Sequence, residues 1–187
     1  MTVAARYRPS GDTWMAPVKD RRSSDHSTRS PSSRIATRRF DPTRPLVLGG
    51  VTIPGAPGLA GHSDGDAVAH ALIDALLGAA AAGDVGRHFP PGEEAWKGAD
   101  SMELLRWSVG LLRERGFTPR NVDLVVICEM PKIAPVAERM RERLAGVLEV
   151  AVDAVSLKGK TNEGMGWIGA REGLAVHAVA LVEGPDP

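Results

Sequence analysis

Residues 61–90 read GHSDGDAVAHALIDALLGAAAAGDVGRHFP and carry a strong helix signal. Their Ala- and Leu-rich part predicts a helix over residues 64–82, which Gly83 ends because glycine readily adopts the left-handed conformation common after a helix. Residues 84–99 contain Pro90-Pro91-Gly92 and predict a long loop. A loop of this length inside a compact domain is usually functional or mobile, so the helix and the loop are the first place to look for a site.

Asp66, His70 and Asp74 are spaced by four residues and therefore share one face of this helix. The rest of the helix is mostly Ala, Val, Leu and Ile, and a polar group on an apolar helix needs a partner where it is buried. A metal bound by the histidine, with the carboxylates as its outer partners, is one solution. A solvent-facing stripe or a hydrogen-bonded core histidine is the other, and the spacing alone favours it because no HExxH-type motif is present.

His62 and Ser63 lie at the N-terminus of the predicted helix, where free backbone N–H groups and the helix dipole favour an anion. Histidine could add a hydrogen bond or a positive charge there. Alternatively, Ser63 or Asp64 is simply the N-cap of the helix, which is the commoner arrangement.

The segments outside this helix predict further strands and helices. Gly49-Gly50 lies between two short apolar runs and predicts a hairpin turn. Asp100 and Glu103 resemble a capping box at the start of a second helix, which Gly116 ends. The whole pattern predicts an α+β fold, a two-layer sandwich with a mixed β-sheet and helices packed on one face. The expected strands are residues 46–48, 51–53, 122–128, 152–158 and 174–182, and the expected helices are residues 64–82, 100–116 and 135–147.

The composition divides the chain into two unequal parts. The 187 residues, 43% of them hydrophobic, carry 23 Lys+Arg and 23 Asp+Glu, and this zero net charge argues against a dedicated nucleic-acid-binding protein. Residues 1–50 are nevertheless basic, with ten Lys/Arg against four Asp, and the remainder is acidic. Residues 1–38 are Ser- and Arg-rich without a hydrophobic period and predict a disordered or aberrant segment, followed by one domain over residues 39–187. Binding of nucleic acid or anionic lipid is the functional alternative to a solvated tail.

Three observations predict a cytoplasmic protein without a membrane partner. The sequence has no run of about 18 apolar residues that would form a membrane helix. Its first residues lack the apolar core of a signal peptide. The single cysteine, Cys128, cannot form an internal disulfide, which suits a reducing compartment.

Two segments that follow predicted strands could bind a nucleotide. Residues 158–167, KGKTNEGMGW, combine glycines that let a backbone approach a ligand with lysines suited to phosphate and a carboxylate suited to phosphate-bound Mg²⁺. Residues 128–135, CEMPKIAP, hold two prolines that fix a strand-end loop able to read a base through its backbone. Taken alone, the first segment could equally be a polar turn, and Cys128 is best interpreted as a small buried side chain.

Together with WKGADS and WIGAREG, these segments resemble the 2-C-methyl-D-erythritol 2,4-cyclodiphosphate synthase family, from Phe40 to Glu183. The resemblance implies a trimer-forming α+β sandwich, a homotrimer with active sites between adjacent subunits. It implies a lyase of the non-mevalonate isoprenoid pathway that acts on 4-CDP-2-C-methyl-D-erythritol 2-phosphate. The 2-phosphate would attack the β-phosphorus, close 2-C-methyl-D-erythritol 2,4-cyclodiphosphate and release CMP, with Zn²⁺ and with Mg²⁺ or Mn²⁺ on the diphosphate.

The same resemblance assigns roles to individual residues. His62 and Thr161 would be catalytic residues that hold the reacting phosphates, and His70 would bind zinc. Glu163 would approach the Mg²⁺ or Mn²⁺ through the substrate. The substrate-binding residues would be His62, Ser63, Asp84, Val85, Gly86, Phe89, Glu93, Cys128, Met130, Pro131, Lys132, Ile133, Ala134, Lys160, Thr161, Asn162, Glu163 and Trp167.

The chain departs from the family pattern where two zinc ligands are expected. The family has Asp-x-His just before the position of Arg39-Phe40, whereas this chain has Ala36-Thr37-Arg38, and neither Ala nor Arg ligates zinc. Either a change of reading frame upstream of Arg39 altered this segment, or the chain is a variant that binds zinc weakly and turns over poorly. The alternative function is then a catalytically impaired trimer that binds CDP-type nucleotides or isoprenoid diphosphates.

Overall fold

The computed structural model describes residues 27–28 and 31–185. No helix in these ranges is long and apolar enough to cross a membrane. In chain order the elements are β1 (Ser27–Thr28), β2 (Ser32–Leu48), β3 (Val51–Leu59), α1 (Ala67–Ala79), α2 (Val85–His88), η1 (Glu94–Trp96), α3 (Ser101–Glu114), β4 (Thr118–Ile127), α4 (Ala137–Leu148), η2 (Val152–Ala154), β5 (Val155–Lys160), α5 (Gly166–Gly169) and β6 (Gly173–Gly184).

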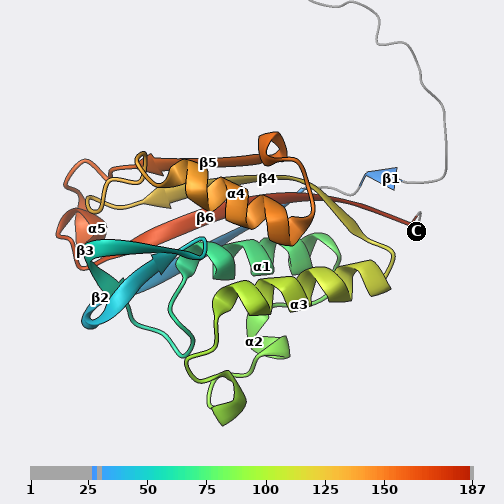
Figure 1. Ribbon diagram of the computed structural model, residues 1–187, viewed down its shortest axis with the longest axis horizontal. Coiled ribbons are helices and arrows are strands. Elements are labelled where there is room, and N and C mark those ends of the chain that lie inside the picture. Colours follow the sequence, from blue (N-terminus) through green and yellow to red (C-terminus); the bar gives the residue numbers. More distant parts are fainter. Residues whose placement is uncertain (1–26, 29–30, 186–187) are drawn as a thin grey trace, which may run out of the picture.

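The strands form one mixed sheet in the order β3-β2-β6-β4-β5, and the short β1 pairs with β6. Strands β4 and β5 are parallel, whereas the other neighbours are antiparallel. Figure 1 shows α1 and α3 together on one side of these strands. The α+β architecture with a mixed sheet is therefore confirmed.

Strand β6 shows why helices cover one face of the sheet. Its side chains alternate: Leu174, Val176, Ala178, Ala180 and Val182 are fully buried, while most residues between them are only half-buried. Such alternation is typical of a strand with one covered face. Helix α1 contacts β2, β6 and β4, α4 contacts β5, and α3 packs against α1 and α4. The expected two-layer arrangement is thus confirmed.

The hairpin between β2 and β3 forms at Gly49-Gly50, as predicted. Both glycines have positive φ angles, 55° and 71°, which the favoured two-residue turns require. The strands are much longer than the predicted 46–48 and 51–53, because β2 continues back to Ser32.

The prediction of disorder up to residue 38 is wrong for residues 32–38. This part of β2 pairs in antiparallel register with β6, from Ser32 opposite Ala180 to Arg38 opposite Leu174. Strand preference depends strongly on the neighbouring strand, and the apolar β6 supplies the partner that the polar composition of β2 concealed. Residues 27–28 of the same segment form β1 and also pair with β6, whereas residues 1–26 and 29–30 lie outside the described residues.

Asp66 joins the hairpin to helix α1. The helix begins after Asp66 and not at residue 64, because the Asp66 carboxylate caps it by accepting from the backbone N–H groups of Val68 (2.9 Å) and Ala69 (3.0 Å). The same carboxylate accepts from Gly49 N–H (2.9 Å) and Gly50 N–H (2.7 Å). Asp66 is completely buried, so four backbone donors are satisfied inside the core by one side chain.

The later elements follow the prediction with shifted boundaries. Asp100 caps α3 as expected, accepting from Met102 N–H (2.8 Å), but Glu103 pairs with Arg106 instead of completing a capping box. The predicted loop over residues 84–99 contains α2 and η1, and the predicted strand from residue 152 starts with the short helix η2. Helix α5 was not predicted.

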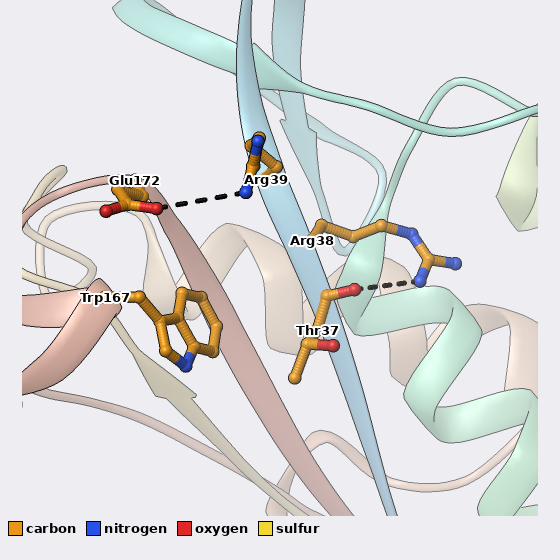
Figure 2. A pocket seen from close by; sticks show the side chains of 5 residues that line it. All are labelled: Thr37, Arg38, Arg39, Trp167 and Glu172. Atoms are coloured by element: carbon orange, nitrogen blue, oxygen red, sulfur yellow. Dashed lines mark hydrogen bonds and ion pairs between the residues drawn. The ribbon is translucent and has the colours of Figure 1, made fainter.

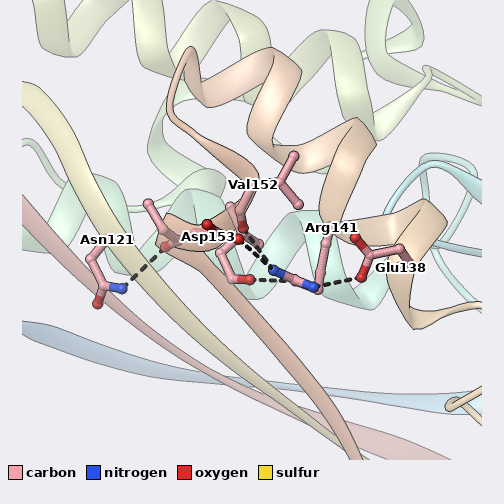
Figure 3. A network of polar contacts seen from close by, with 7 residues as sticks. Asn121, Glu138, Arg141, Val152 and Asp153 are labelled. Atoms are coloured by element: carbon pink, nitrogen blue, oxygen red, sulfur yellow. Dashed lines mark hydrogen bonds and ion pairs between the residues drawn. The ribbon is translucent and has the colours of Figure 1, made fainter.

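Arg141 fixes α4 to the start of β5. Its guanidinium donates to the carbonyl oxygens of Val155 (2.7 Å) and Val152 (3.0 Å) and pairs with Glu138 (2.5 Å). Asn121 on β4 donates to the carbonyl oxygen of Ala154 (3.1 Å) from the other side (Figure 3). The polar contacts thus hold the parallel strand β5 in place, and β5 leads directly to the KGKTNEG segment.

We expect Asp66→Ala to lower the free energy of unfolding by at least about 2 kcal/mol, because it removes a helix cap and leaves buried N–H groups unpaired. Urea unfolding would measure this change. Asp153→Ala, which removes an exposed carboxylate, is the control and should stay within about 0.5 kcal/mol of the unaltered protein. Equal stability of the two variants would contradict this role of Asp66.

Candidate functional site

A cavity of about 310 Å³ lies between β2, α1 and the residues after α1. We call it the His70 cavity. Its wall includes an edge-to-face pair of aromatic rings, Phe89 and Trp96, with centroids 5.1 Å apart. The Trp96 Nε1–H is buried and finds no hydrogen-bond partner among the described residues. The lining residues are Arg38, His62, Ser63, His70, Val85, Gly86, Phe89, Pro90, Pro91, Trp96 and Leu104.

His70 is held from both of its ring nitrogens. Its Nδ1 lies 3.3 Å from an Arg38 guanidinium nitrogen, and its Nε2 lies 2.9 Å from the Ser63 hydroxyl oxygen. Burial, reinforced by Arg38, lowers the pKa of His70 to about 4 although Asp64 acts in the opposite direction, so the ring is neutral near pH 7. Because arginine can only donate, Nδ1 accepts from Arg38 and Nε2 carries the proton toward Ser63.

The partner of the polar stripe on α1 is a pair of arginines on β2. Arg34 and Arg38 pair with Ala178 and Leu174 of β6, and directly paired residues of antiparallel strands point to the same face. Both arginines therefore lie on the face that the helices cover. Asp74 interacts electrostatically with both of them and also accepts from Val85 N–H (2.7 Å). The stripe faces the sheet, so the solvent-facing interpretation is wrong.

The segment before α1 is fixed by backbone contacts. Arg44 donates to the carbonyl oxygens of Gly61 (2.7 Å) and Ser63. His62 is exposed, and its Nε2 accepts from Gly92 N–H (3.0 Å). His62 is thereby held beside the loop that closes the other side of the His70 cavity.

The donors around His70 do not form a zinc site. Zinc takes at least three Cys, His, Asp or Glu ligands, and no group of three such residues within residues 27–28 and 31–185 could hold a metal ion. The side chain of Ala36 has no ligand atom, and the two His70 ring nitrogens face the Arg38 guanidinium and the Ser63 hydroxyl. The residues of this chain therefore do not fit the zinc ion that the resemblance implies.

A second cavity, of about 170 Å³, lies where β4 and β5 end. We call it the Lys132 cavity. The Glu129 carboxylate orders its rim by accepting from the backbone N–H groups of Asn162 (3.0 Å) and Gly164 (3.1 Å). The lining residues are Cys128, Glu129, Pro131, Lys132, Ile133, Ala134, Gly159, Lys160 and Thr161.

Comparison with known proteins identifies relatives of this chain. The YgbB family model matches residues 35–183. The chain belongs to the YgbB family. The 2-C-methyl-D-erythritol 2,4-cyclodiphosphate synthase of Symbiobacterium thermophilum is 57% identical over 146 residues, which are 78% of this chain and 93% of that protein. The resemblance found in the sequence is confirmed.

Solved structures of YgbB relatives share the fold. The IspF of Plasmodium falciparum in complex with CDP superposes with a TM-score of 0.73 at 29% identity, over 85% of this chain and 97% of the other. The bifunctional IspDF of Campylobacter jejuni gives a TM-score of 0.81 at 36% identity, over 86% of this chain. This chain spans 43% of that longer protein.

The structure distributes the family's expected site residues over the two cavities. His62, Ser63, His70, Val85, Gly86 and Phe89 line the first, and Cys128, Pro131, Lys132, Ile133, Ala134, Lys160 and Thr161 line the second. Asp84 caps α2, Thr161 donates to Glu163 (2.6 Å), and Asn162 donates to the carbonyl oxygen of Met165 (2.7 Å). The expected residues that line neither cavity are Asp84, Glu93, Met130, Asn162, Glu163 and Trp167.

Trp167, on α5, lies beside a third cavity, between β2 and the residues just before β6. Thr37, Arg38, Arg39, Trp167 and Glu172 line it, and Figure 2 shows Arg39 directed toward Glu172 while the Arg38 side chain extends toward the neighbouring helix. Arg38 thus lies between this cavity and the His70 cavity.

Sequence reasoning missed several lining residues of this YgbB site. Glu129 lies within the 128–135 segment expected to contact a base, but its carboxylate was given no role, although many binding residues follow a buried strand in this way. Arg38 follows Arg34 by four residues and therefore points to the same face of a strand. Its contact with His70 on α1 depends on a strand register that the sequence did not reveal. Nothing in the local pattern distinguished Trp96 or Leu104.

We expect Cys128 to react slowly with iodoacetamide. Burial, with a contribution from Glu129, raises the pKa of this thiol from 9.0 to about 11, which lowers its thiolate fraction about 100-fold. As the only cysteine, it is the sole source of thiol labelling, and the urea-unfolded chain is the control. Equal labelling rates for the folded and unfolded chains would contradict this.

Proposed function

We propose that this chain binds 4-CDP-2-C-methyl-D-erythritol 2-phosphate and converts it to the cyclic diphosphate and CMP. The observation that carries the proposal is the grouping of most of the expected residues around two cavities. One is lined by His62, Ser63, Val85, Gly86 and Phe89, and the other by Cys128, Pro131, Lys132, Ile133, Ala134, Lys160 and Thr161. The 57% identity to a synthase of that name supports it. The single, buried cysteine Cys128 is compatible with the reducing cytoplasm expected for such an enzyme.

We infer that a complete site combines the two cavities from neighbouring copies of a homotrimer. The two linings share no residue, so each cavity holds only part of the expected set. The His70 cavity is walled by Phe89 and Trp96 and suits the methylerythritol unit. The Lys132 cavity, with its strand-end backbone and lysines, suits a cytosine and the phosphates attached to it.

The proposed reaction is an intramolecular phosphoryl transfer. An oxygen of the 2-phosphate forms a bond to the β-phosphorus, and the bond from that phosphorus to the CMP oxygen breaks, so CMP leaves with the electron pair. Such a reaction depends on positioning and on neutralisation of charge. His62 and Thr161 would orient the phosphates, and Lys132 and Lys160 would offset their charge.

The residues of this chain suit one of the two expected metal ions and not the other. Glu163 is an exposed carboxylate next to Thr161, and one carboxylate beside substrate phosphates is a common way to hold Mg²⁺ or Mn²⁺. Glu163 would help to hold such an ion, which would offset the negative charge of the diphosphate. No step is assigned to zinc, because the donors around His70 do not fit it.

The contact between Arg38 and His70 favours a second candidate function: a zinc-deficient trimer that binds CDP-type nucleotides or isoprenoid diphosphates with impaired turnover. Incubation with 4-CDP-2-C-methyl-D-erythritol 2-phosphate and Mg²⁺, followed by ³¹P NMR, separates the two. Equal amounts of CMP and cyclic diphosphate support the synthase. Saturable binding without CMP release would overturn it and support the binding protein.

We expect Lys132→Met to weaken CDP binding about tenfold, because it removes a cation from the cavity proposed for the nucleotide. Isothermal titration calorimetry measures the dissociation constant. Lys97→Met is the matched control: Lys97 pairs with Glu94 and lines neither cavity, so its CDP affinity should change by less than about twofold. Equal affinities for the two variants would contradict the assignment of the nucleotide to this cavity.

A further inference from the structure

Arg38 lies on the face of the sheet that the helices cover, not on the solvent-facing side. Its backbone pairs with Leu174, which is fully buried beneath the helices, so its side chain extends along the covered face of the sheet. It reaches His70 on α1 and lines the His70 cavity. Burial lowers the pKa of Arg38, with Asp74 opposing the shift, yet a guanidinium remains charged at any ordinary pH.

The charge of this guanidinium is only partly compensated. One of its nitrogens donates to the carbonyl oxygen of Thr37 (3.0 Å), and another approaches His70 Nδ1 (3.3 Å). A guanidinium has five N–H donors, so three remain for other partners. Within the described ranges Arg38 forms no ion pair with a carboxylate. A half-buried cation with spare donors at a cavity wall is suited to an anionic ligand.

The contact with His70 also decides against a metal at this place. The Nδ1 lone pair accepts from Arg38, so it is not free to bind a metal. A dication at the same position would lie next to a guanidinium in a region of reduced dielectric, where like charges repel strongly.

We propose that the Arg38 guanidinium is the fixed cation of the His70 cavity and binds a phosphate of the diphosphate ligand there without a metal ion. This inference rests on the proposed function, since it concerns the same ligand. The planar guanidinium donates two parallel N–H groups to phosphate oxygens. It neutralises one charge, whereas a divalent ion would neutralise two and act as a Lewis acid, so binding is retained more fully than turnover.

The first test measures binding of inorganic pyrophosphate by calorimetry in the presence of EDTA. We expect Arg38→Met to weaken it at least about tenfold and Arg38→Lys to weaken it less. Arg34→Met removes the other arginine of the same strand face, which approaches Gly78 and lines neither cavity, and should change the affinity by less than about twofold. Equal affinities for the Arg38→Met variant and the unaltered chain would overturn the proposal.

The second test measures bound metal and does not depend on activity. After dialysis against excess zinc and then buffer, the unaltered chain should retain little zinc by elemental analysis. The double variant Ala36→Asp/Arg38→His, which supplies two ligands beside His70, should retain about one zinc per chain. One tightly bound zinc per unaltered chain would overturn the proposal.

CMP binding separates this inference from the proposed function. CMP is expected in the Lys132 cavity, so its affinity should be the same in the unaltered chain and in Arg38→Met. If no variant binds CMP or CDP, the proposed function fails while the pyrophosphate comparison still decides the role of Arg38. If CMP binds and Arg38→Met keeps its pyrophosphate affinity, the role of Arg38 fails and the proposed function stands.

Discussion

The fold depends on one buried carboxylate. Asp66 binds four backbone N–H groups, two in the Gly49-Gly50 turn and two in the first turn of α1. It therefore sets the position of the hairpin relative to the helix that packs on it. Ser63 and His70, which line the His70 cavity, flank Asp66 in the sequence, so this contact helps to position them against β2. A structural carboxylate, which the sequence pattern grouped with possible metal partners, thus positions the site without entering it.

The second constraint is the register of β2 against β6. Alternate residues of a strand point to opposite faces, so the pairing of Arg38 with Leu174 directs a guanidinium beneath α1. On the facing side of α1, His70 contacts this guanidinium and Asp74, one turn further along, interacts with it electrostatically. The His70 cavity, where the family resemblance implies a metal ion, is thus lined by the Arg38 guanidinium. The remaining residues of both cavities keep the groups expected for phosphates and a cytosine.

The sequence predicted what depends on local chemistry. The hairpin follows from two adjacent glycines and α3 from Asp100 and Gly116, whereas the grouping of Lys132 with Thr161 was implied only by the family resemblance. What it missed depends on partners distant in the chain. The polar first half of β2 becomes a strand only because β6 is apolar, and Arg38 faces His70 only because of the register. Helix α1 begins three residues later than predicted, because the Asp66 carboxylate accepts from the backbone N–H groups of its first turn, and α4 begins two residues later than predicted, after Val136.

We propose above that the Arg38 guanidinium takes the place of a metal ion in the diphosphate site. A crystal structure of the chain grown with CDP and zinc tests it most directly. We expect cytosine against residues 128–134, a phosphate within hydrogen-bond distance of the Arg38 guanidinium of a neighbouring copy, and the contact between Arg38 and His70 retained. A zinc ion bound to His70, with Arg38 turned away from the cavity, would contradict it.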